Sequence, residues 1–354
     1  MRIAQVVQRY FPYIGGLETH VAEISKRLVA KGFEIEILTT DPTRTLPPEE
    51  MVNGLKVRRF KSWAPDEAYY FSGVLKKFLA LNASAYDIVH AHAYHSFPAL
   101  YAAQTKQRNR LFFNPHYHGR GHTFVRNLLL IPYKSIAKTL FQKADRIICV
   151  SKYERGLIRK DFDVEENRIS VIPNGVVLEE FKNLQKQKKS YRTILCVSRL
   201  ERYKGIDFLI RVLPKLSDDV QLEIVGKGPF RKNLTKLARV LKLEKRVSFS
   251  ESLPRKELLQ KYVNADLFAL LSRHEAYGIS VAEALASRTP CIVANASALQ
   301  EWVDNKNCFG LNYPIELDAL ADLINHTIGK KVDEVYLTDW NENVEKLSRL
   351  YLSC

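Results

Sequence analysis

Two glutamates, Glu275 and Glu283, are separated by seven residues that include Gly278. The apolar run 265–271 before them is typical of a buried strand, and 279–286 is typical of a helix start. Glu275 is therefore predicted in a strand-to-helix loop and Glu283 in the helix itself. The backbone N–H groups of Gly278, Ile279 and Ser280 would project from the helix N-terminus, where unpaired donors and the helix dipole attract anions.

A carboxylate on each side of an anion site suits a ligand with hydroxyls at both ends and phosphate between them. A nucleotide sugar has this layout. The alternative is that Glu275 and Glu283 are ordinary polar residues near a helix start, which are common.

Two cations lie at a similar point earlier in the chain. Arg199 follows the apolar run 193–197, and Lys204 precedes a predicted helix that begins at Gly205. An arginine fork and a lysine point charge can together hold a diphosphate, although both residues can equally be solvated surface charges. The predicted strand 221–225 runs into Gly226, where a glycine turn can lie under a base or phosphate or can be only a turn.

Paired glycines, Gly15 and Gly16, follow the first predicted strand and open the first predicted helix. Glycine lets the backbone approach a ligand closely and leaves helix N–H groups open to phosphate. The pattern is not G-x-G-x-x-G, so it gives little support to a dinucleotide cofactor. A tight turn without ligand explains this loop as well.

Histidines gather in the first half of the chain, at His90, His92, His95, His116 and His118. Imidazole is a common metal ligand, but no H-E-x-x-H motif or carboxylate framework accompanies these residues. The five cysteines form no C-x-x-C pair, which indicates reduced thiols and no zinc site. We therefore expect no metal and no cofactor, and favour hydrogen bonding of the histidines to sugar or phosphate.

Strand-like and helix-like segments alternate along the whole chain, which indicates an α/β fold with parallel sheets. The series breaks at a polar, basic stretch, 179–190, and then restarts. We expect a first doubly wound domain over 1–178, a linker over 179–190 and a second domain over 191–336. Ligands of such sheets bind beyond the carboxyl ends of the strands. An amphipathic helix is predicted over 340–352, within a last segment of 337–354.

The net charge of +15 is unevenly distributed. Residues 1–190 carry 30 Lys and Arg against 18 Asp and Glu, or +12, and residues 191–354 carry 24 against 21, or +3. A basic half suggests an acidic partner such as phosphate, an anionic membrane or nucleic acid, or simply a soluble surface. No apolar run is long enough to span a bilayer, and the N-terminus has no signal-peptide pattern. We expect a cytoplasmic protein.

These pieces, in this order, resemble the retaining glycosyltransferases of family 4, which have the GT-B fold of two Rossmann-like domains facing a cleft. The resemblance covers nearly the whole chain, including a typical domain junction at 171–176. It joins four motifs: Gly15-Gly16, His118-Gly119, Arg199 with Lys204, and the pair Glu275 and Glu283. The usual glycine before Arg199 is Ser198 here.

The resemblance implies roles for these residues. Arg199 and Lys204 would bind the donor diphosphate, Glu283 the ribose hydroxyls and Glu275 hydroxyls of the transferred sugar. The backbone from Gly278 to Ser280 would touch sugar or phosphate. Gly15 and Gly16 would approach the donor from the first domain, His118 would line the reacting sugar and acceptor, and the C-terminal helix would return to the first domain.

The expected reaction is metal-independent, retaining transfer of a hexose from a UDP-sugar or GDP-sugar to a glycan or lipid-linked acceptor. The segment 123–143 mixes apolar and basic residues, so it either lies peripherally on an anionic membrane or packs on its own domain. Rival functions are a synthase or phosphorylase acting on soluble sugars and a non-catalytic nucleotide-sugar-binding protein. A nucleic-acid binder ranks last because no recognised binding motif is present.

Overall fold

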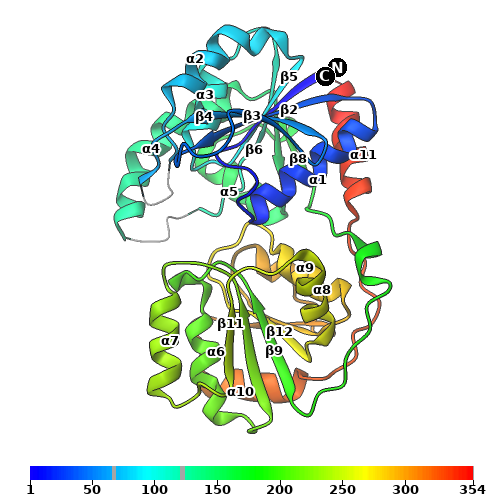
Figure 1. Cartoon of the computed structure of the whole chain (residues 1–354). Helices are drawn as coiled ribbons and strands as arrows, with labels where there is room; N and C mark the ends of the chain where they lie inside the picture. The colour runs from blue at the N-terminus through cyan, green and yellow to red at the C-terminus, as the bar shows by residue number, and fades with distance from the viewer. Residues whose placement is uncertain (66–68, 120–123, 354) are drawn as a thin grey trace. The chain divides into compact units, whose positions relative to one another are not determined.

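The computed structural model describes residues 1–65, 69–119 and 124–353, with the side chains of 124–132 left aside. Within this part the chain divides into two compact units. The first comprises Met1–Asn174 and Trp340–Cys354, and the second comprises Gly175–Asp339. Each unit is built on its own sheet (Figure 1), and the two are described separately.

The first unit contains an eight-stranded sheet in the order β3-β4-β2-β1-β5-β6-β7-β8. All neighbouring strands run parallel except the hairpin of β3 and β4. The strands are β1 (Arg2–Val6), β2 (Glu34–Asp41), β3 (Glu49–Val52), β4 (Leu55–Lys61), β5 (Ile88–His92), β6 (Arg110–Asn114), β7 (Arg146–Cys149) and β8 (Ile169–Val171).

Helices cover both faces of this sheet. Residues of α2 (Gly73–Asn82), α3 (Phe97–Gln104), α4 (Phe124–Lys143) and α5 (Lys152–Phe162) enter one apolar core with alternate residues of the strands. On the other face lie α1 (Gly16–Ala30) and α11 (Trp340–Leu352), side by side in Figure 1. The segment predicted to be amphipathic is helical as α4, but its residue 123 and the side chains up to 132 lie outside the described residues.

The helix α11 is tied to this unit by polar contacts at both ends. Arg27 Nε donates to Asn341 Oδ1 over 3.0 Å, and Lys31 Nζ lies 2.6 Å from Glu345 Oε2. The Tyr351 hydroxyl lies 2.6 Å from His90 Nδ1 inside the core. The helix α11 therefore completes the first unit, because its apolar stripe needs another apolar surface to pack against. The stripe consists of Trp340, Val344, Leu347 and Tyr351.

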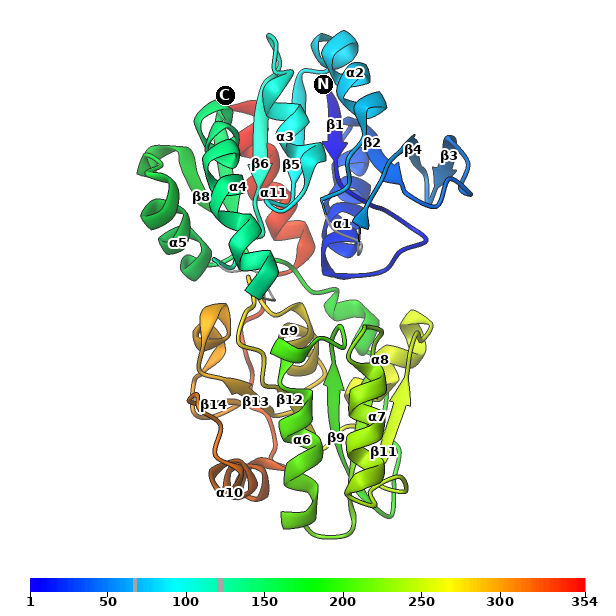
Figure 2. The same cartoon turned by 90° about the vertical axis from the view of Figure 1, so that its left-hand side faces the viewer.

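The second unit contains a six-stranded, all-parallel sheet in the order β11-β10-β9-β12-β13-β14. Figure 2 shows these strands side by side in the lower part of the picture. They are β9 (Arg192–Val197), β10 (Val220–Val225), β11 (Val247–Ser250), β12 (Leu267–Leu270), β13 (Cys291–Ala294) and β14 (Cys308–Leu311).

Alternation along the strands supplies two cores, one on each face of the second sheet. In β12, Leu267 and Ala269 face the core shared with α6 (Ile206–Val212), α7 (Arg231–Val240) and α10 (Leu317–Thr327). Phe268 and Leu270 face the core shared with α8 (Arg255–Asn264) and α9 (Ile279–Ala286). Strands buried on both faces are characteristic of doubly wound sheets, so the fold is α/β with two Rossmann-like units, as predicted.

The segment 179–190, expected to be a linker, instead packs along the second unit. Phe181 is buried in the core with α8 and α9, and Lys186 Nζ lies 2.6 Å from Asp266 Oδ1. Its polar composition reflects an exposed outer side. The chain passes between units at Asn174 and Gly175 and again at Asp339 and Trp340.

Candidate active site

The strand order of the second sheet reverses direction between β9 and β12. From β9 the chain moves outward to β10 and β11, then returns to β12 on the other side of β9. At such a switch point the loops after the two central strands diverge and leave room for a ligand. The predicted residues Arg199, Lys204 and Glu275 all lie in these two loops.

Lys204 and Glu275 are paired in this position. Lys204 Nζ donates to Glu275 Oε1 over 2.5 Å, with side chains only 10% and 17% exposed. Burial alone would lower the pKa of Lys204, but the Glu275 carboxylate and Tyr203 together outweigh it and raise that pKa. Lys204 therefore stays positively charged and can bind a phosphate.

The two loops are held to one another by their backbones. Arg273 N donates to the Tyr203 carbonyl over 2.9 Å. Glu275 N donates to Ser297 Oγ over 3.0 Å, which brings in the loop after β13. Contacts among the loops after β9, β12 and β13 thus fix the position of Glu275.

The helix α9 begins at Ile279 beside this ion pair. Gly278 is its N-cap residue, with φ of +99°, and its carbonyl accepts from Val281 N at 2.9 Å. A Cβ on Gly278 would lie 2.9 Å from Leu299 Cδ2, so both φ and space require glycine. The helix start predicted from the sequence is confirmed, and its positive dipole end lies at the carboxyl edge of the sheet.

Glu283 lies one turn into α9 and is 8% exposed. Its Oε1 accepts from an Arg255 guanidinium N–H, and the same guanidinium contacts Glu180 Oε2 at 2.7 Å. Sequence reasoning missed Arg255 and Glu180. No local pattern could reveal them, because they come from α8 and from the segment 178–181, far apart in the chain.

Gly226 follows β10 and touches the loop after β9. A Cβ at Gly226 would lie 1.9 Å from the Ser198 carbonyl oxygen, and its φ is +146°. Only glycine fits this approach. Gly226 therefore sets how closely the two loops pack, whereas Arg199, one residue beyond Ser198, extends outward with a side chain 54% exposed.

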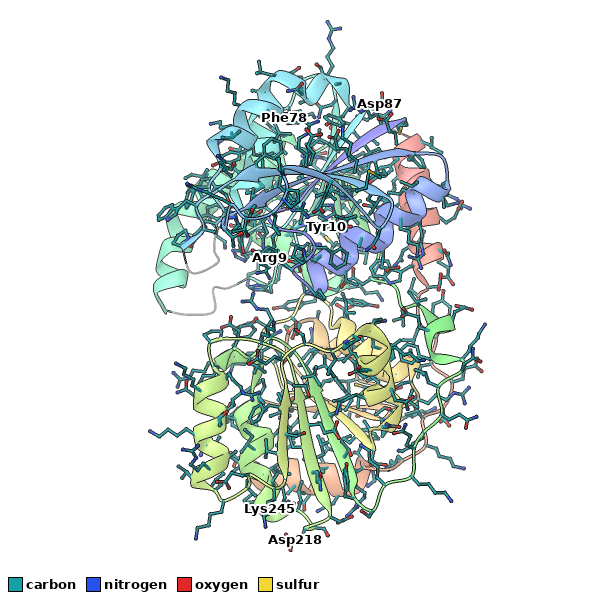
Figure 3. All side chains as sticks on the ribbon, viewed as in Figure 1. Arg9, Tyr10, Phe78, Asp87, Asp218 and Lys245 are labelled. Carbon is teal, nitrogen blue, oxygen red and sulfur yellow. The ribbon has the colours of Figure 1, made fainter. Side chains whose placement is uncertain are left out.

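The other predicted residues belong to the first unit. Gly15 caps α1 in an extended conformation, and Gly16 is the first residue of that helix. Arg9, labelled in Figure 3, closes the loop before them, with its Nε 2.6 Å from Glu18 Oε1. His118 lies in the loop after β6, its ring 5.2 Å from that of His95.

The second unit thus offers a buried cation, a helix N-terminus, one carboxylate in the loop after β12 and a second carboxylate in α9. The positive features suit a diphosphate, and carboxylates suit sugar hydroxyls. Two Rossmann-like units, one of which carries this arrangement, are characteristic of glycosyltransferases with the GT-B fold.

The comparisons with known proteins agree. Residues 14–180 match the family model Glycosyltransferase Family 4, and residues 178–346 match that of Glycosyl transferases group 1. Together the two models cover most of the chain, which therefore belongs to the family 4 glycosyltransferases.

Three relatives are similar to this chain along most of their length. An uncharacterized glycosyltransferase of Methanocaldococcus jannaschii is 28% identical, covering 91% of this chain and 87% of the relative. A subunit of phosphatidylinositol N-acetylglucosaminyltransferase from Saccharomyces cerevisiae is 26% identical, covering 92% and 74%. The alpha-monoglucosyldiacylglycerol synthase of Streptococcus pneumoniae is 24% identical, covering 98% and 85%.

A solved structure shares the fold. The sucrose-phosphate synthase of Thermosynechococcus elongatus superposes with a TM-score of 0.82 at 20% identity, covering 99% of this chain and 98% of that one. At this identity the likeness concerns the fold alone.

Proposed function

We propose that this protein is a retaining hexosyltransferase that moves a sugar from UDP-sugar or GDP-sugar to a hydroxyl of a lipid-linked or glycan acceptor. The observation that carries the proposal is the buried pair of Lys204 and Glu275 beside the start of α9. A cation and a helix N-terminus there can bind a diphosphate, and Glu275 is placed to hold hydroxyls of the attached sugar.

In this reaction the bond between the sugar anomeric carbon and the β-phosphate oxygen breaks, and a bond to the acceptor oxygen forms. The acceptor proton passes to the departing phosphate. Negative charge grows on the diphosphate while the sugar becomes oxocarbenium-like. Arg199, Lys204 and the N-terminus of α9 would stabilise that charge electrostatically, so that no metal is required at the diphosphate.

The acceptor is proposed from two features. Two of the relatives named above have names that contain a lipid, phosphatidylinositol in one and monoglucosyldiacylglycerol in the other. In addition, the basic excess lies in residues 1–190, which suits an anionic surface. None of the described helices is long and apolar enough to cross a membrane, so contact through the surface is the form we propose, at the cytoplasmic face.

The first test is calorimetric binding of UDP and of GDP to the protein in the presence of a chelator. We expect one of them to bind, and Lys204→Ala to weaken that binding at least tenfold. The matched control is Lys232→Met, which removes an exposed lysine of α7 and should bind like the parent. Absence of binding to either nucleotide would contradict the proposal.

A soluble sugar acceptor is the alternative, as for a synthase or phosphorylase. Transfer assays with the preferred donor distinguish the two: radioactivity from the labelled sugar should enter a lipid-extractable product or a polymeric glycan, and not a small free sugar. Labelled small sugars as the sole product would favour the alternative while leaving the donor site intact.

A further inference from the structure

Three histidines from different elements of the first unit meet at the carboxyl edge of its sheet. His20 lies in α1, His92 ends β5, and His116 lies in the loop after β6. One ring nitrogen of each lies within 4.8 Å of those of the other two. The His20 ring centroid is 5.6 Å from that of His92 and 5.0 Å from that of His116.

Hydrogen bonds to amide oxygens fix two of these rings. His20 Nδ1 lies 2.7 Å from Asn174 Oδ1, and His92 Nε2 lies 2.7 Å from Gln5 Oε1. A carbonyl oxygen only accepts, so each of these ring nitrogens carries the proton. The opposite nitrogens, His20 Nε2 and His92 Nδ1, are then unprotonated lone-pair donors. Metal-binding histidines are oriented in this way by the partner of the second nitrogen.

The nitrogens left over are buried without a partner. Within the described residues, no hydrogen bond reaches His20 Nε2, His92 Nδ1 or His116 Nε2. Burying an unsatisfied polar atom costs about 1–3 kcal/mol each, so one on each of three clustered rings needs an explanation. A ligand that binds all three rings supplies it.

The chemistry of the three atoms decides the class of ligand. The lone pairs of His20 Nε2 and His92 Nδ1 repel the oxygens of a phosphate, and one hydroxyl has a single proton for these two acceptors. An all-imidazole set without carboxylate suits Zn²⁺ and its neighbours, not Mg²⁺ or Ca²⁺. We propose that His20, His92 and His116 form a binding site for one divalent transition-metal ion of the Zn²⁺ type.

This differs from our expectation of no metal, because His20 was not among the clustered histidines in the sequence. Only the folding of α1 against β5 and β6 brings it there. The histidines belong to the first unit, whereas Lys204 and Glu275 belong to the second.

Only a small closure is needed. Two nitrogens bound to one tetrahedral ion at about 2.0–2.1 Å lie about 3.3 Å apart. The ring nitrogens must therefore approach one another by up to about 1.5 Å from the 4.8 Å given above. His116 is the least buried of the three, so its loop offers both the entry route and the adjustment. A fourth position would remain for water.

The test is a titration of chelator-treated, dialysed protein with Co²⁺, followed by its visible absorption. We expect one equivalent to bind with the intense bands of tetrahedral coordination, and Zn²⁺ to displace it. X-ray absorption of the Zn²⁺-loaded parent protein should give imidazole nitrogens at about 2.0–2.1 Å. This second measurement uses only the parent protein, so it tests the proposal even if a substitution unfolds the chain.

Two variants locate the ion. His20→Gln and His116→Asn should each weaken Co²⁺ binding at least tenfold; asparagine suits the φ of +48° at His116. The control is His326→Gln, which alters an exposed histidine of α10 and should bind like the parent. Failure of the parent to bind one ion, undiminished binding in both variants, or a coordination shell without imidazole would overturn the proposal.

Discussion

At the scale of single residues, Gly226 determines whether the loops after β9 and β10 can pack. A Cβ there would meet the Ser198 carbonyl oxygen at 1.9 Å, and rigid backbone cannot yield as a side chain would. Gly226→Ala should therefore cost about 1–3 kcal/mol of unfolding free energy and displace Arg199. Urea denaturation and nucleotide calorimetry would measure the two effects.

The matched control for that change is Gly156→Ala, inside α5, where an added Cβ meets nothing within 4 Å. Alanine in a helix interior should leave stability unchanged or raise it by about 0.5–1 kcal/mol. Equal behaviour of the two variants would show that the close approach at Ser198 has no energetic importance.

We expect Arg255 to act on a donor through Glu283. Its guanidinium joins Glu283 to Glu180, so we regard it as a positioning residue. Since Glu283 is proposed to hold ribose, distant from the reacting bond, Arg255→Met should raise the donor KM about tenfold, or about 1.4 kcal/mol, with kcat changed less. Steady-state kinetics would measure both constants.

The neighbouring exposed residue provides the comparison for Arg255. Lys256→Met removes a charge from the same turn of α8 and should leave both constants near the parent values. A fall in kcat with unchanged KM for Arg255→Met would contradict the positioning role.

At the scale of elements, the histidines between α1, α11 and the first sheet couple folding to pH. Burial lowers the pKa of His20 to about 4 and that of His90 to about 3, with His92 and His116 also well below 6.5. The unfolded chain binds protons near pH 6.5 and the folded chain does not. Stability is therefore present above pH 6.5 and is lost as pH falls toward 4.

Each of the four histidines contributes a slope approaching ~1.4 kcal/mol per pH unit. Glu154 opposes them, because burial raises its pKa to about 8 and favours the folded state below that pH. The net expectation for metal-free protein is a clear loss of unfolding free energy between pH 6.5 and 5, measured by denaturant titration. A flat profile across this range would show that the rings are accessible to protons when folded.

The sequence predicted helices and loops better than it predicted contacts between distant residues. The bounds of α9 and the placing of Glu275 in a loop follow from local patterns of apolar residues and glycine, so they were predictable. The contacts of Arg255 with Glu283 and of His20 with His116 join distant segments through packing, and no spacing in the chain encodes them. The hairpin of β3 and β4 was likewise missed, since β3 is a short polar strand at the sheet edge and the apolar residues of β4 alternate with charged ones.

At the scale of the whole molecule, net charge predicts behaviour at membranes. With +15 overall and +12 of it in residues 1–190, the protein should bind vesicles containing anionic lipid, at about 1 kcal/mol for each Lys or Arg near the surface. Cosedimentation should fall sharply between low salt and about 0.5 M salt, because screening shortens the reach of charge.

Vesicles of neutral lipid serve as the control and should bind little. Equal binding to both kinds of vesicle, or none to either, would remove the electrostatic argument for a membrane-bound acceptor while leaving the donor site untouched.

The return of α11 to the first unit has a consequence for synthesis. Residues 175–339 form one continuous stretch and can fold as soon as they leave the ribosome. The first unit, although it begins earlier, lacks Tyr351 against His90 and Trp340 against His20 until the final helix is made. We therefore expect the second unit to complete its folding before the first unit, whose sheet stays incompletely covered until α11 has been synthesised.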